Sequence, residues 1–286
     1  MSLTIGSPPD PHAAATRLDA ALAALSPRVV ACSGGIDSLL LATVAHRADP
    51  TATIVAHTVT PAVPGDGTAR VVDHARREGW DLRIVRSGEF DDERYLSNPT
   101  DRCYHCKSNL YDAIAEISTS VAGDRPADAT GRVILSGANV DDLGEYRPGL
   151  TAAAERGVRH PYVEADVTKR EIRAIARSLG LAEADLPASP CLASRLYTGT
   201  RVTASRLRAV EAGEALVRAA AGIDVVRCRV DVDTVRVEVG DGDRHLIDEA
   251  LLASIADTMR RVEPGIVSVG LDAEAYEPGR AFVGRP

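Results

Sequence analysis

The sequence has no long hydrophobic runs, only two lysines and neither of two common phosphate-binding fingerprints. No stretch approaches about 18 consecutive apolar residues, so no membrane span is expected. Lys107 and Lys169 are the only lysines, so nearly all the positive charge is arginine. Neither G-x-x-x-x-G-K-[ST] nor G-x-G-x-x-G occurs, which excludes the usual P-loop and dinucleotide-binding signatures.

Excess positive charge and a recognisable signal peptide are also missing. The net charge is -8, whereas a broad nucleic-acid surface needs positive charge, so nucleic acid is not an expected partner. Residues 1–12 contain three prolines and are predicted to be a flexible tail. The five cysteines are an odd number, which together with the absent signal peptide indicates a reducing cytoplasm rather than a disulfide scaffold.

The chain does contain an alternation of short apolar strands and helices over its first two thirds. Strands are predicted at 28–32, 53–58, 81–86 and 133–135. Helices are predicted at 13–25, 38–48, 68–79, 107–118 and 168–180. Irregular stretches are predicted at 61–67, 88–109, 123–131 and 184–203. This order predicts an α/β fold with a doubly wound parallel, Rossmann-like sheet over residues 13–187.

The pattern changes in the last third of the chain. The predicted elements there are a helix at 203–221, strands at 224–231 and 234–240, a helix at 244–260 and a strand at 265–270. Helices and strands in this order are typical of a small α+β domain. We therefore predict a second, smaller domain over residues 188–286.

A Gly-rich turn after the first strand carries the strongest chemical signal. The run Ser33-Gly34-Gly35-Ile36-Asp37-Ser38 follows an apolar strand directly and opens a helix. Backbone N–H groups of such a turn, with the positive end of the helix, form a cradle for phosphate. The two glycines allow close approach of the backbone to the anion, and the serines add hydroxyl groups. Asp37 is placed to orient Mg²⁺ or the turn itself.

Other strand ends are expected at the same edge of the sheet, because ligands of parallel sheets bind at the carboxyl ends of the strands. His57 and Thr58 are predicted to contact the base of a nucleotide. Gly137 and Asn139 follow another strand and are predicted to line the same rim. Asp142, one of two adjacent acids, is the predicted ligand of a phosphate-bound Mg²⁺.

The cysteines suggest sulfur or metal chemistry. Cys191 lies in a proline-bounded loop and is either a reactive thiol or a small buried connector residue. Cys103 and Cys106 form a C-x-x-C pair that suits zinc, redox chemistry, an iron–sulfur cluster or two surface thiols. Three thiolates leave one open iron on a [4Fe–4S] cluster, whereas structural zinc needs four ligands. Cys32 and Cys228 are predicted to be core residues without chemistry.

Two arginines alternate with Cys228 on a predicted strand. Arg227 and Arg229 therefore share one face, and paired guanidinium groups suit phosphate. The alternative is two solvated arginines on an exposed sheet face. Glu211 and Glu214 share a face of the preceding helix.

Several motifs together resemble a known family. The phosphate loop resembles that of the PP-loop ATP pyrophosphatases, which hold the pyrophosphate of ATP and transfer AMP. Between about residues 15 and 275 the chain resembles the LarE family, ATP-dependent sulfur transferases of nickel-pincer nucleotide cofactor biosynthesis. The motifs that carry this resemblance, besides the loop, are Asn139-Val140-Asp141-Asp142, Tyr146-Arg147-Pro148-Gly149, Thr168-Lys169-Arg170-Glu171-Ile172-Arg173 with Leu179-Gly180-Leu181, and Pro190-Cys191-Leu192-Ala193-Ser194-Arg195.

The resemblance implies a two-stage reaction that uses ATP and Mg²⁺. A carboxylate of pyridinium-3,5-biscarboxylic acid mononucleotide is adenylylated, and sulfur then displaces AMP to give the thiocarboxylate. In one form of the family the sulfur is that of the cysteine equivalent to Cys191, which ends as dehydroalanine. The presence of Cys103 and Cys106 as well favours a [4Fe–4S] cluster that donates sulfide, with His105 a less favoured ligand. The implied substrate contacts are Lys107, Ser194, Arg195, Arg227, Arg229 and either Glu214 or Glu211.

The resemblance also implies a homo-oligomer, a trimer or hexamer, and contact with other proteins that build the cofactor. Two other functions are open. The first is a different PP-loop enzyme, either a tRNA-thiolating sulfurtransferase, which would favour a basic surface, or an amide synthetase, which has no use for three cysteines. The second is a nucleotide-sensing or Fe–S-carrying protein, which would bind ATP without releasing pyrophosphate.

Overall fold

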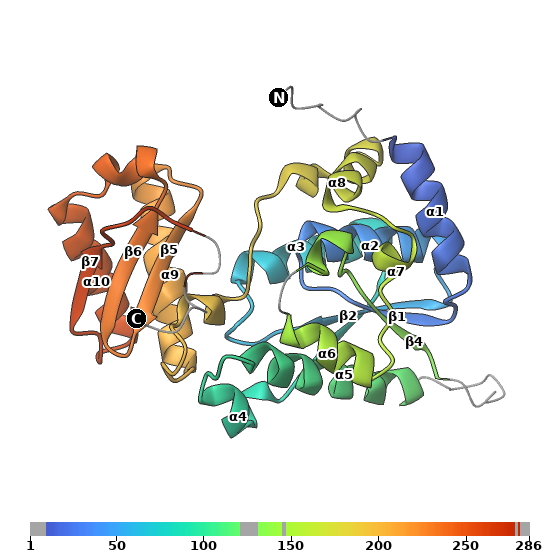
Figure 1. Ribbon diagram of the computed structural model, residues 1–286, viewed down its shortest axis with the longest axis horizontal. Helices are drawn as coiled ribbons and strands as arrows, with labels where there is room; N and C mark the ends of the chain where they lie inside the picture. Colours follow the sequence, from blue (N-terminus) through green and yellow to red (C-terminus); the bar gives the residue numbers. More distant parts are fainter. Residues whose placement is uncertain (1–9, 121–130, 145–146, 278–279, 281–286) are drawn as a thin grey trace. The chain divides into compact units, whose positions relative to one another are not determined.

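The computed structural model describes residues 10–120, 131–144, 147–277 and 280, and the chain divides into two compact units (Figure 1). The first comprises Met1–Val59, Gly65–Gly88 and Cys106–Ser189. The second comprises Thr60–Pro64, Glu89–His105 and Pro190–Pro286. The sequence pattern predicts a single boundary between residues 187 and 188, whereas two short earlier segments belong with the C-terminal part of the chain.

The first unit is built on a four-stranded parallel sheet. Its strands are β1 (Arg28–Ala31), β2 (Thr53–Thr58), β3 (Asp81–Val85) and β4 (Val133–Ser136). Their order is β3-β2-β1-β4, and Val30 of β1 is in register with Val55 of β2 and Leu135 of β4. The chain moves outward from β1 to β3 and then returns to the other side of β1. The order therefore reverses between β1 and β4, which is where ligands bind in such sheets.

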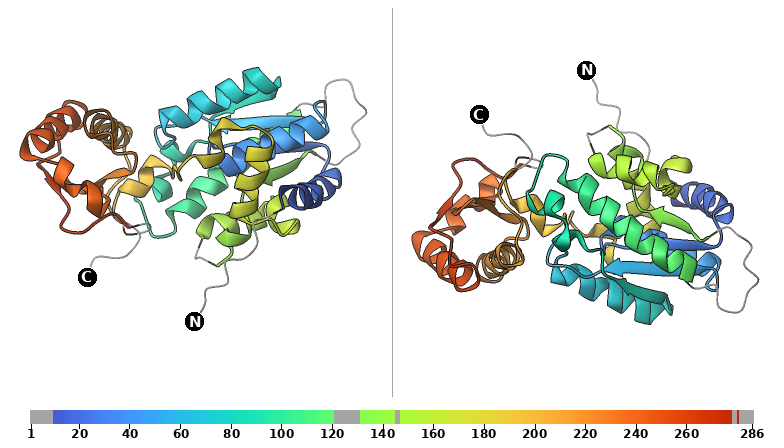
Figure 2. Two further views of the ribbon diagram at one scale, coloured as in Figure 1. Left: turned by 90° about the horizontal axis from the view of Figure 1, so that it is seen from above. Right: turned by 90° about the horizontal axis from the view of Figure 1, so that it is seen from below.

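Helices cover both faces of this sheet (Figure 2). Neighbouring residues of a strand point to opposite faces. Val30 and Leu135 thus pack in one core with the helices α1, α2 and α8, while Val29 and Ile134 pack in another with α5 and α6. This arrangement confirms the α/β fold with a doubly wound parallel sheet. The helical elements of the unit are α1 (Pro11–Ala23), α2 (Ile36–Ala48), α3 (Gly65–Glu78), α5 (Arg102–Ser120), which starts in the second unit, η2 (Val140–Asp142), α6 (Pro148–Glu155), α7 (Pro161–Glu164), α8 (Lys169–Ser178) and η3 (Ala182–Asp185).

The second unit contains a separate three-stranded sheet of order β5-β6-β7. Strand β5 (Val226–Asp231) is antiparallel to β6 (Thr234–Val239), which is parallel to β7 (Ser268–Leu271). Two helices, α9 (Ala204–Ala221) and α10 (Glu249–Val262), pack against each other and against the sheet. The shorter elements are η1 (Glu89–Asp91), α4 (Glu93–Leu96), η4 (Leu192–Arg195) and η5 (Asp241–Leu246).

The segment 89–105 joins the second unit through hydrogen bonds from a buried asparagine. The Nδ2 of Asn98 donates to the carbonyl oxygens of Tyr197 and Thr200, both at 2.8 Å, and the Asn98 carbonyl accepts from Gly199. The guanidinium of Arg102 also donates to the carbonyl of Ala193 at 3.0 Å. These long-range bonds attach 89–105 to residues 190–202 and cannot be seen from local sequence pattern.

Several element boundaries follow the sequence signals closely. Helix α8, predicted over 168–180, begins at a capping box of Thr168 and Glu171, and Gly180, at φ +71°, follows its end. Helix α9 is capped by Thr203 and ends at Gly222, whose φ is +68°.

Other boundaries differ from the prediction. Helix α5 starts at residue 102 rather than 107, so the C-x-x-C pair lies on a helix and not in an irregular stretch. Its first turn is polar and lacks the apolar periodicity that marks a helix in sequence. Helix α3 starts at Gly65, inside the predicted loop 61–67, and β7 starts at Ser268, three residues later than predicted. The predicted helix 244–260 is divided into η5 and α10 by the capping residue Asp248.

Some predictions fall wholly or partly on residues that are not described. Residues 1–9 of the predicted tail lie outside the described residues, and α1 already begins at Pro11, capped by Asp10. Residues 121–130 of the predicted loop 123–131 and Tyr146 of the quoted motif also lie outside them. Among residues 10–120, 131–144, 147–277 and 280, no helix is long and apolar enough to span a membrane.

Candidate functional site

The Gly-rich turn after β1 has the shape of an anion cradle. Gly34 has a φ of +84°, in the left-handed region that favours glycine. A Cβ at this position would collide with the carbonyl group of Gly67, whose carbon would be only 2.9 Å away. Gly35 is the N-cap of α2 and has no side chain to take up the first N–H groups of the helix. The positive end of α2 is therefore available to a phosphate.

The two serines of the turn have different roles. The hydroxyl of Ser38 is buried, accepts from the Ser33 N–H and donates to the Gly35 carbonyl, both at 3.0 Å. It also lies 3.2 Å from the Ser33 hydroxyl. Ser38 thus closes the turn on itself, while Ser33 is exposed at its surface. Of the two predicted hydroxyl donors, Ser33 is the better placed to meet a ligand.

The loop after β4 lies against the phosphate loop, as the strand order requires. A Cβ on Gly137 would be 3.1 Å from both the Asp37 carbonyl carbon and the Ser38 nitrogen. Asn139 is fully buried, and its Oδ1 accepts from the Asp141 N–H at 3.0 Å. Its Nδ2 has no hydrogen-bond partner among the described residues. A buried unpaired donor is costly, so this amide is suited to a bound ligand.

Asp37, at the start of α2, carries a second buried polar atom without a partner among the described residues. Its Oδ2 lies 3.5 Å from the Nζ of Lys169, and its buried Oδ1 has no partner in the described part of the chain. Burial raises the pKa of Asp37, and the charge of Lys169 opposes the rise. Sequence reasoning did not assign Lys169 a role, although it is one of only two lysines and begins α8.

The adjacent acids after Asn139 are already engaged. The carboxylate of Asp142 accepts from the Asn139 N–H and pairs with Arg147, both at 3.0 Å. The carboxylate of Asp141 accepts from the Lys169 N–H at 2.6 Å. Both acids thus organise the loop and the start of α8. The role of Asp142 as a Mg²⁺ ligand stays a prediction.

His57 lies beneath the phosphate loop. It is buried, with Nδ1 2.8 Å from the Cys32 carbonyl oxygen and Nε2 3.0 Å from the Thr68 hydroxyl. Burial lowers the pKa of His57, which favours the neutral ring. The ring positions the end of β1, and the neighbouring Thr58 is partly exposed. Contact of His57 and Thr58 with a nucleotide base stays a prediction.

In the second unit, a buried ion pair holds the loop that carries Cys191. One edge of the Arg195 guanidinium donates to both oxygens of Glu214, Nε to Oε1 at 2.9 Å and Nη2 to Oε2 at 3.0 Å. The Nη1 of Arg195 donates to the carbonyls of Pro190 at 2.7 Å and Cys191 at 3.2 Å. The Cys191 residue itself is exposed. The buried Arg195 therefore fixes the backbone of the residue that carries the exposed Cys191 side chain.

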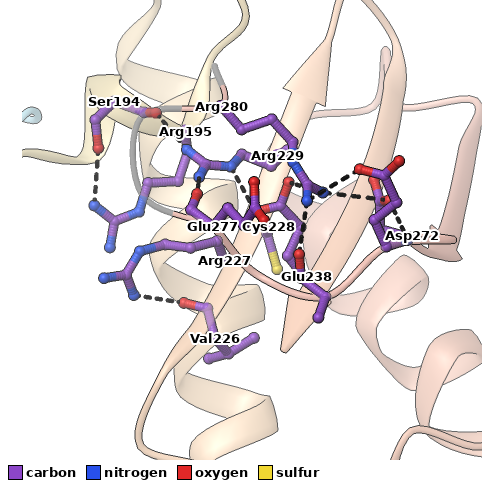
Figure 3. A network of polar contacts seen from close by, with 12 residues as sticks. Ser194, Arg195, Val226, Arg227, Cys228, Arg229, Glu238, Asp272, Glu277 and Arg280 are labelled. Atoms are coloured by element: carbon purple, nitrogen blue, oxygen red, sulfur yellow. Dashed lines mark hydrogen bonds and ion pairs between the residues drawn. The ribbon is translucent and has the colours of Figure 1, made fainter. Parts of the chain in front are cut away.

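A second buried ion pair lies on β5 and β6 (Figure 3). The Nε of Arg229 lies 2.9 Å from Glu238, and its Nη1 donates to the Ser194 carbonyl at 2.8 Å. Arg280 lies 3.3 Å from the other oxygen of Glu238. Burial raises the pKa of Glu238, and the arginines oppose this. The network ties the sheet to η4, which follows Cys191 directly.

Arg227 shares the face of Arg229 but has a different environment. It is 6% exposed, and its guanidinium donates to the Val226 carbonyl at 2.7 Å and lies 5.1 Å from the ring centre of Tyr276. No carboxylate pairs with it among the described residues. Burial and the nearby charge of Arg195 lower the pKa of Arg227. The arginines of β5 are thus buried and not solvated, and Arg227 has no ion-paired carboxylate in the described part of the chain, so a bound anion would supply a counter-charge.

The two glutamates of α9 differ in burial. Glu214 is 1% exposed and also accepts from the Cys228 N–H at 3.2 Å, whereas Glu211 is half-buried. Glu214 therefore belongs to the network, and contact of either residue with substrate stays a prediction. Cys228 and Cys32 are core residues, as predicted. Burial raises the pKa of the Cys32 thiol to about 11, and that of Cys228 is raised further.

The remaining cysteines lie near the start of α5. Cys103 and Cys106 are three residues apart, so they are neighbours on one helical turn, and both are half-buried. The Arg102–Ala193 hydrogen bond, within the second unit, joins the start of α5 to the turn that follows Cys191.

Of the three predicted cluster ligands, Cys103 and Cys106 lie on one turn of α5. Among the described residues, no three His, Cys, Asp or Glu side chains are grouped so as to hold a metal ion. The cluster ligands Cys103, Cys106 and Cys191 stay a prediction. Lys107, the next residue of α5, lies 5.8 Å from the ring centre of Tyr111, and its contact with substrate stays a prediction as well.

Sequence comparison adds three relatives. The chain is 32% identical over 253 residues to an uncharacterised protein of Synechocystis sp., covering 88% of this chain and 90% of that protein. It is 30% identical over 271 residues to the pyridinium-3,5-bisthiocarboxylic acid mononucleotide synthase of Lactiplantibacillus plantarum, covering 92% and 91%. An uncharacterised protein of Methanocaldococcus jannaschii is 26% identical over 190 residues, covering 66% and 69%. No family model matches the chain.

Proposed function

Because the chain belongs to the family of pyridinium-3,5-bisthiocarboxylic acid mononucleotide synthase, the LarE family, we propose that it is an ATP-dependent sulfur transferase. Its substrate is pyridinium-3,5-biscarboxylic acid mononucleotide, and its product is the thiocarboxylate used in nickel-pincer nucleotide cofactor biosynthesis. One structural observation supports the proposal in addition to the sequence similarity. The chain combines a phosphate cradle at the open N-terminus of α2 with an exposed Cys191 on a backbone clamped by Arg195.

The first stage is adenylylation, in the manner of a PP-loop ATP pyrophosphatase. A substrate carboxylate oxygen attacks the α-phosphorus of ATP, and the bond from that phosphorus to the bridging oxygen breaks. Pyrophosphate leaves with the electron pair, and an acyl adenylate is formed. The cradle of Ser33, Gly34 and Gly35 supplies N–H donors to the phosphates. Asp37, with its unpartnered buried oxygen, is the residue best placed to hold Mg²⁺.

The substrate's own phosphate is proposed to bind at the arginines of β5. Arg227 is the stronger anchor because it is buried without a carboxylate partner among the described residues. Arg229 is already neutralised by Glu238 and is held against the Ser194 carbonyl, so it mainly fixes the geometry. A phosphate monoester would supply the missing negative charge through charge-assisted hydrogen bonds.

The second stage replaces AMP with sulfur. A nucleophilic sulfur attacks the acyl carbon, and AMP leaves with the electrons of the broken carbon–oxygen bond. Thiolate ligands suit iron, and a [4Fe–4S] cluster on Cys103, Cys106 and Cys191 would supply this sulfur as sulfide on an open iron. In the alternative, Cys191 itself attacks. Loss of its α-proton then breaks its Cβ–Sγ bond, which leaves dehydroalanine and the thiocarboxylate.

An intact-mass and iron assay on anaerobically purified protein tests this proposal. The protein is measured before and after incubation with ATP, Mg²⁺ and the pyridinium biscarboxylate mononucleotide, with Cys191→Ser as the variant. We expect bound iron, unchanged polypeptide mass and thiolated product, and a loss of at least about 100-fold in product with the variant, because the sulfur-donating site loses a thiolate. Cys228→Ser, which changes a buried thiol away from this chemistry, is the control.

The alternatives give different results. Loss of the mass of one H₂S, abolished by Cys191→Ser, would assign the sulfur to Cys191 and remove the cluster from the mechanism. Absence of both thiolated product and mass change, with pyrophosphate release stimulated by ammonia or tRNA, would overturn the sulfur-transfer proposal in favour of another enzyme of the same superfamily.

A further inference from the structure

The first turns of α3 contact the backbone of the phosphate loop and of the strand end that precedes it. Gly67 lies against Gly34, where a Cβ would collide with its carbonyl. The hydroxyl of Thr68 reaches Cys32 through His57, with distances of 3.0 Å and 2.8 Å. Helix α3 is thereby held beside the cradle at Gly34 and, through His57, at the carbonyl of Cys32.

Arg70, one turn further along α3, makes a third attachment. Its Nε donates to the Gly34 carbonyl at 3.1 Å, so the guanidinium lies directly on the Gly-rich turn. The other two arginines of this helix have acidic partners, Arg76 with Asp73 at 3.7 Å and Arg77 with Glu183 at 3.4 Å. In the part of the chain that the structure describes, Arg70 has no carboxylate within ion-pair distance, and its two Nη groups have no hydrogen-bond partner.

The number of unused N–H donors on Arg70 indicates what kind of ligand it could bind. A guanidinium carries five N–H donors in a planar fork, and Arg70 uses one of them. The remaining four are held at a turn whose backbone already offers N–H groups to an anion. Arg70 is half-buried, so part of its hydration is already lost. A polyphosphate is the ligand whose charge and oxygen spacing use such a fork best.

We propose that Arg70 binds the β- and γ-phosphates of ATP and stabilises pyrophosphate as it leaves. This inference rests on the ATP-dependent first stage of the proposed function and adds to it a residue that the sequence motifs do not single out. During adenylylation the bond between the α-phosphorus and the bridging oxygen breaks, and the electron pair stays on that oxygen. Negative charge therefore grows on pyrophosphate in the transition state, where a fixed cation is most effective.

A purely structural role makes a different prediction. If Arg70 only fastens α3 to the Gly34 carbonyl, its loss loosens the cradle and weakens every nucleotide that uses it. AMP and ATP share the adenosine and the α-phosphate but differ in the β- and γ-phosphates. The ratio of their affinities therefore separates contact with pyrophosphate from general support of the loop.

Calorimetric titration of the full-length protein with Mg²⁺-ATP and with AMP measures this ratio. For Arg70→Gln we expect ATP affinity to fall about 30-fold and AMP affinity to change less than about twofold, because hydrogen bonds to charged groups are lost only with ATP. Arg70→Lys, which keeps one charge but loses the fork, should fall between the two. Arg76→Gln, an exposed position of the same helix, should leave both affinities unchanged.

Equal losses for ATP and AMP, with a lower melting temperature, would overturn the inference in favour of a structural role. Unchanged affinity for both nucleotides in Arg70→Gln would also overturn it. Neither result affects the proposed function, because the unaltered protein would still bind ATP. A wild-type protein that binds neither nucleotide would instead contradict the ATP-dependent stage of the proposed function.

Discussion

Each of the two units presents a feature that we propose binds an anion, and the two features differ in what they are made of. The cradle of the first unit consists of backbone N–H groups, glycines and a helix N-terminus, with Gly34 and Gly137 packed against backbone atoms. The feature of the second unit consists of charged side chains, in which Arg195 and Arg229 are buried beside Glu214 and Glu238.

The difference shows how each feature keeps its shape. Backbone donors are placed by chain geometry, so their positions depend on conformations that only glycine adopts easily. Buried guanidinium groups are placed by their carboxylate partners, so their positions depend on charge balance. The first feature should therefore fail through steric change and the second through loss of charge, and three substitutions test this contrast from the largest effect to the smallest.

Removing a carboxylate from the second unit should have the largest effect. Glu214→Ala leaves Arg195 buried at 4% exposure without its bidentate partner, and we expect a loss of about 3–5 kcal/mol in the free energy of unfolding. Urea denaturation followed by circular dichroism measures this. The control is Glu93→Ala, which removes the exposed partner of Arg201 in the same unit and should cost no more than about 1 kcal/mol. If the two variants lost the same unfolding free energy, a buried arginine would depend on its carboxylate partner no more than an exposed one does.

Adding a methyl group to the cradle should have an intermediate effect on stability. Gly34→Ala forces a left-handed conformation on alanine and pushes Cβ into the Gly67 carbonyl. We expect a loss of about 1–3 kcal/mol in unfolding free energy and at least about tenfold in ATP affinity.

A matched glycine separates strain from collision in that experiment. Gly88 has a similar φ of +70°, but a Cβ there would meet no atom within 4 Å. Gly88→Ala should therefore cost about 1 kcal/mol and leave ATP binding unchanged. If both alanine variants bound ATP as the unaltered protein does, the close approach to Gly67 would have no part in the cradle.

The smallest effect concerns the Asp37 carboxylate at the start of α2. Burial raises the pKa of Asp37, so the folded protein holds this proton more tightly than the unfolded chain does. The stability associated with the protonated form is then lost as the pH rises above the usual range for aspartate. Asp37→Asn should raise the unfolding free energy at pH 7 by on the order of 1 kcal/mol and have little effect at pH 4. Denaturation at both pH values measures this, and a constant difference between the proteins would contradict the expected titration.

The sequence was sufficient for the features that depend on local pattern. The strand–turn–helix at Ser33 to Ser38, the start of α8 after Thr168 and the end of α9 at Ala221 each have a short-range physical cause. Strand alternation was also enough to place Arg227 and Arg229 on one face, because period two is the geometry of every strand.

The features that the sequence did not predict depend on long-range contacts. The attachment of residues 89–105 to the second unit requires hydrogen bonds from Asn98 to residues about a hundred positions away. The helical placement of Cys103 and Cys106 could not be predicted because their turn has no apolar stripe. Arg70 was one of many arginines, and its importance appears only from the Gly34 carbonyl that it meets and the carboxylate that it lacks among the described residues.

The contacts of Gly34 and Gly137 also limit how this sequence can change over time. A side chain that collides with another side chain can be accommodated by a second substitution that shortens its neighbour. Gly34 would meet the carbonyl of Gly67, and Gly137 would meet the backbone of Asp37 and Ser38, which no substitution can shorten. No single substitution elsewhere can therefore compensate for a side chain at either position. The surrounding loops can change in sequence only while both glycines are kept.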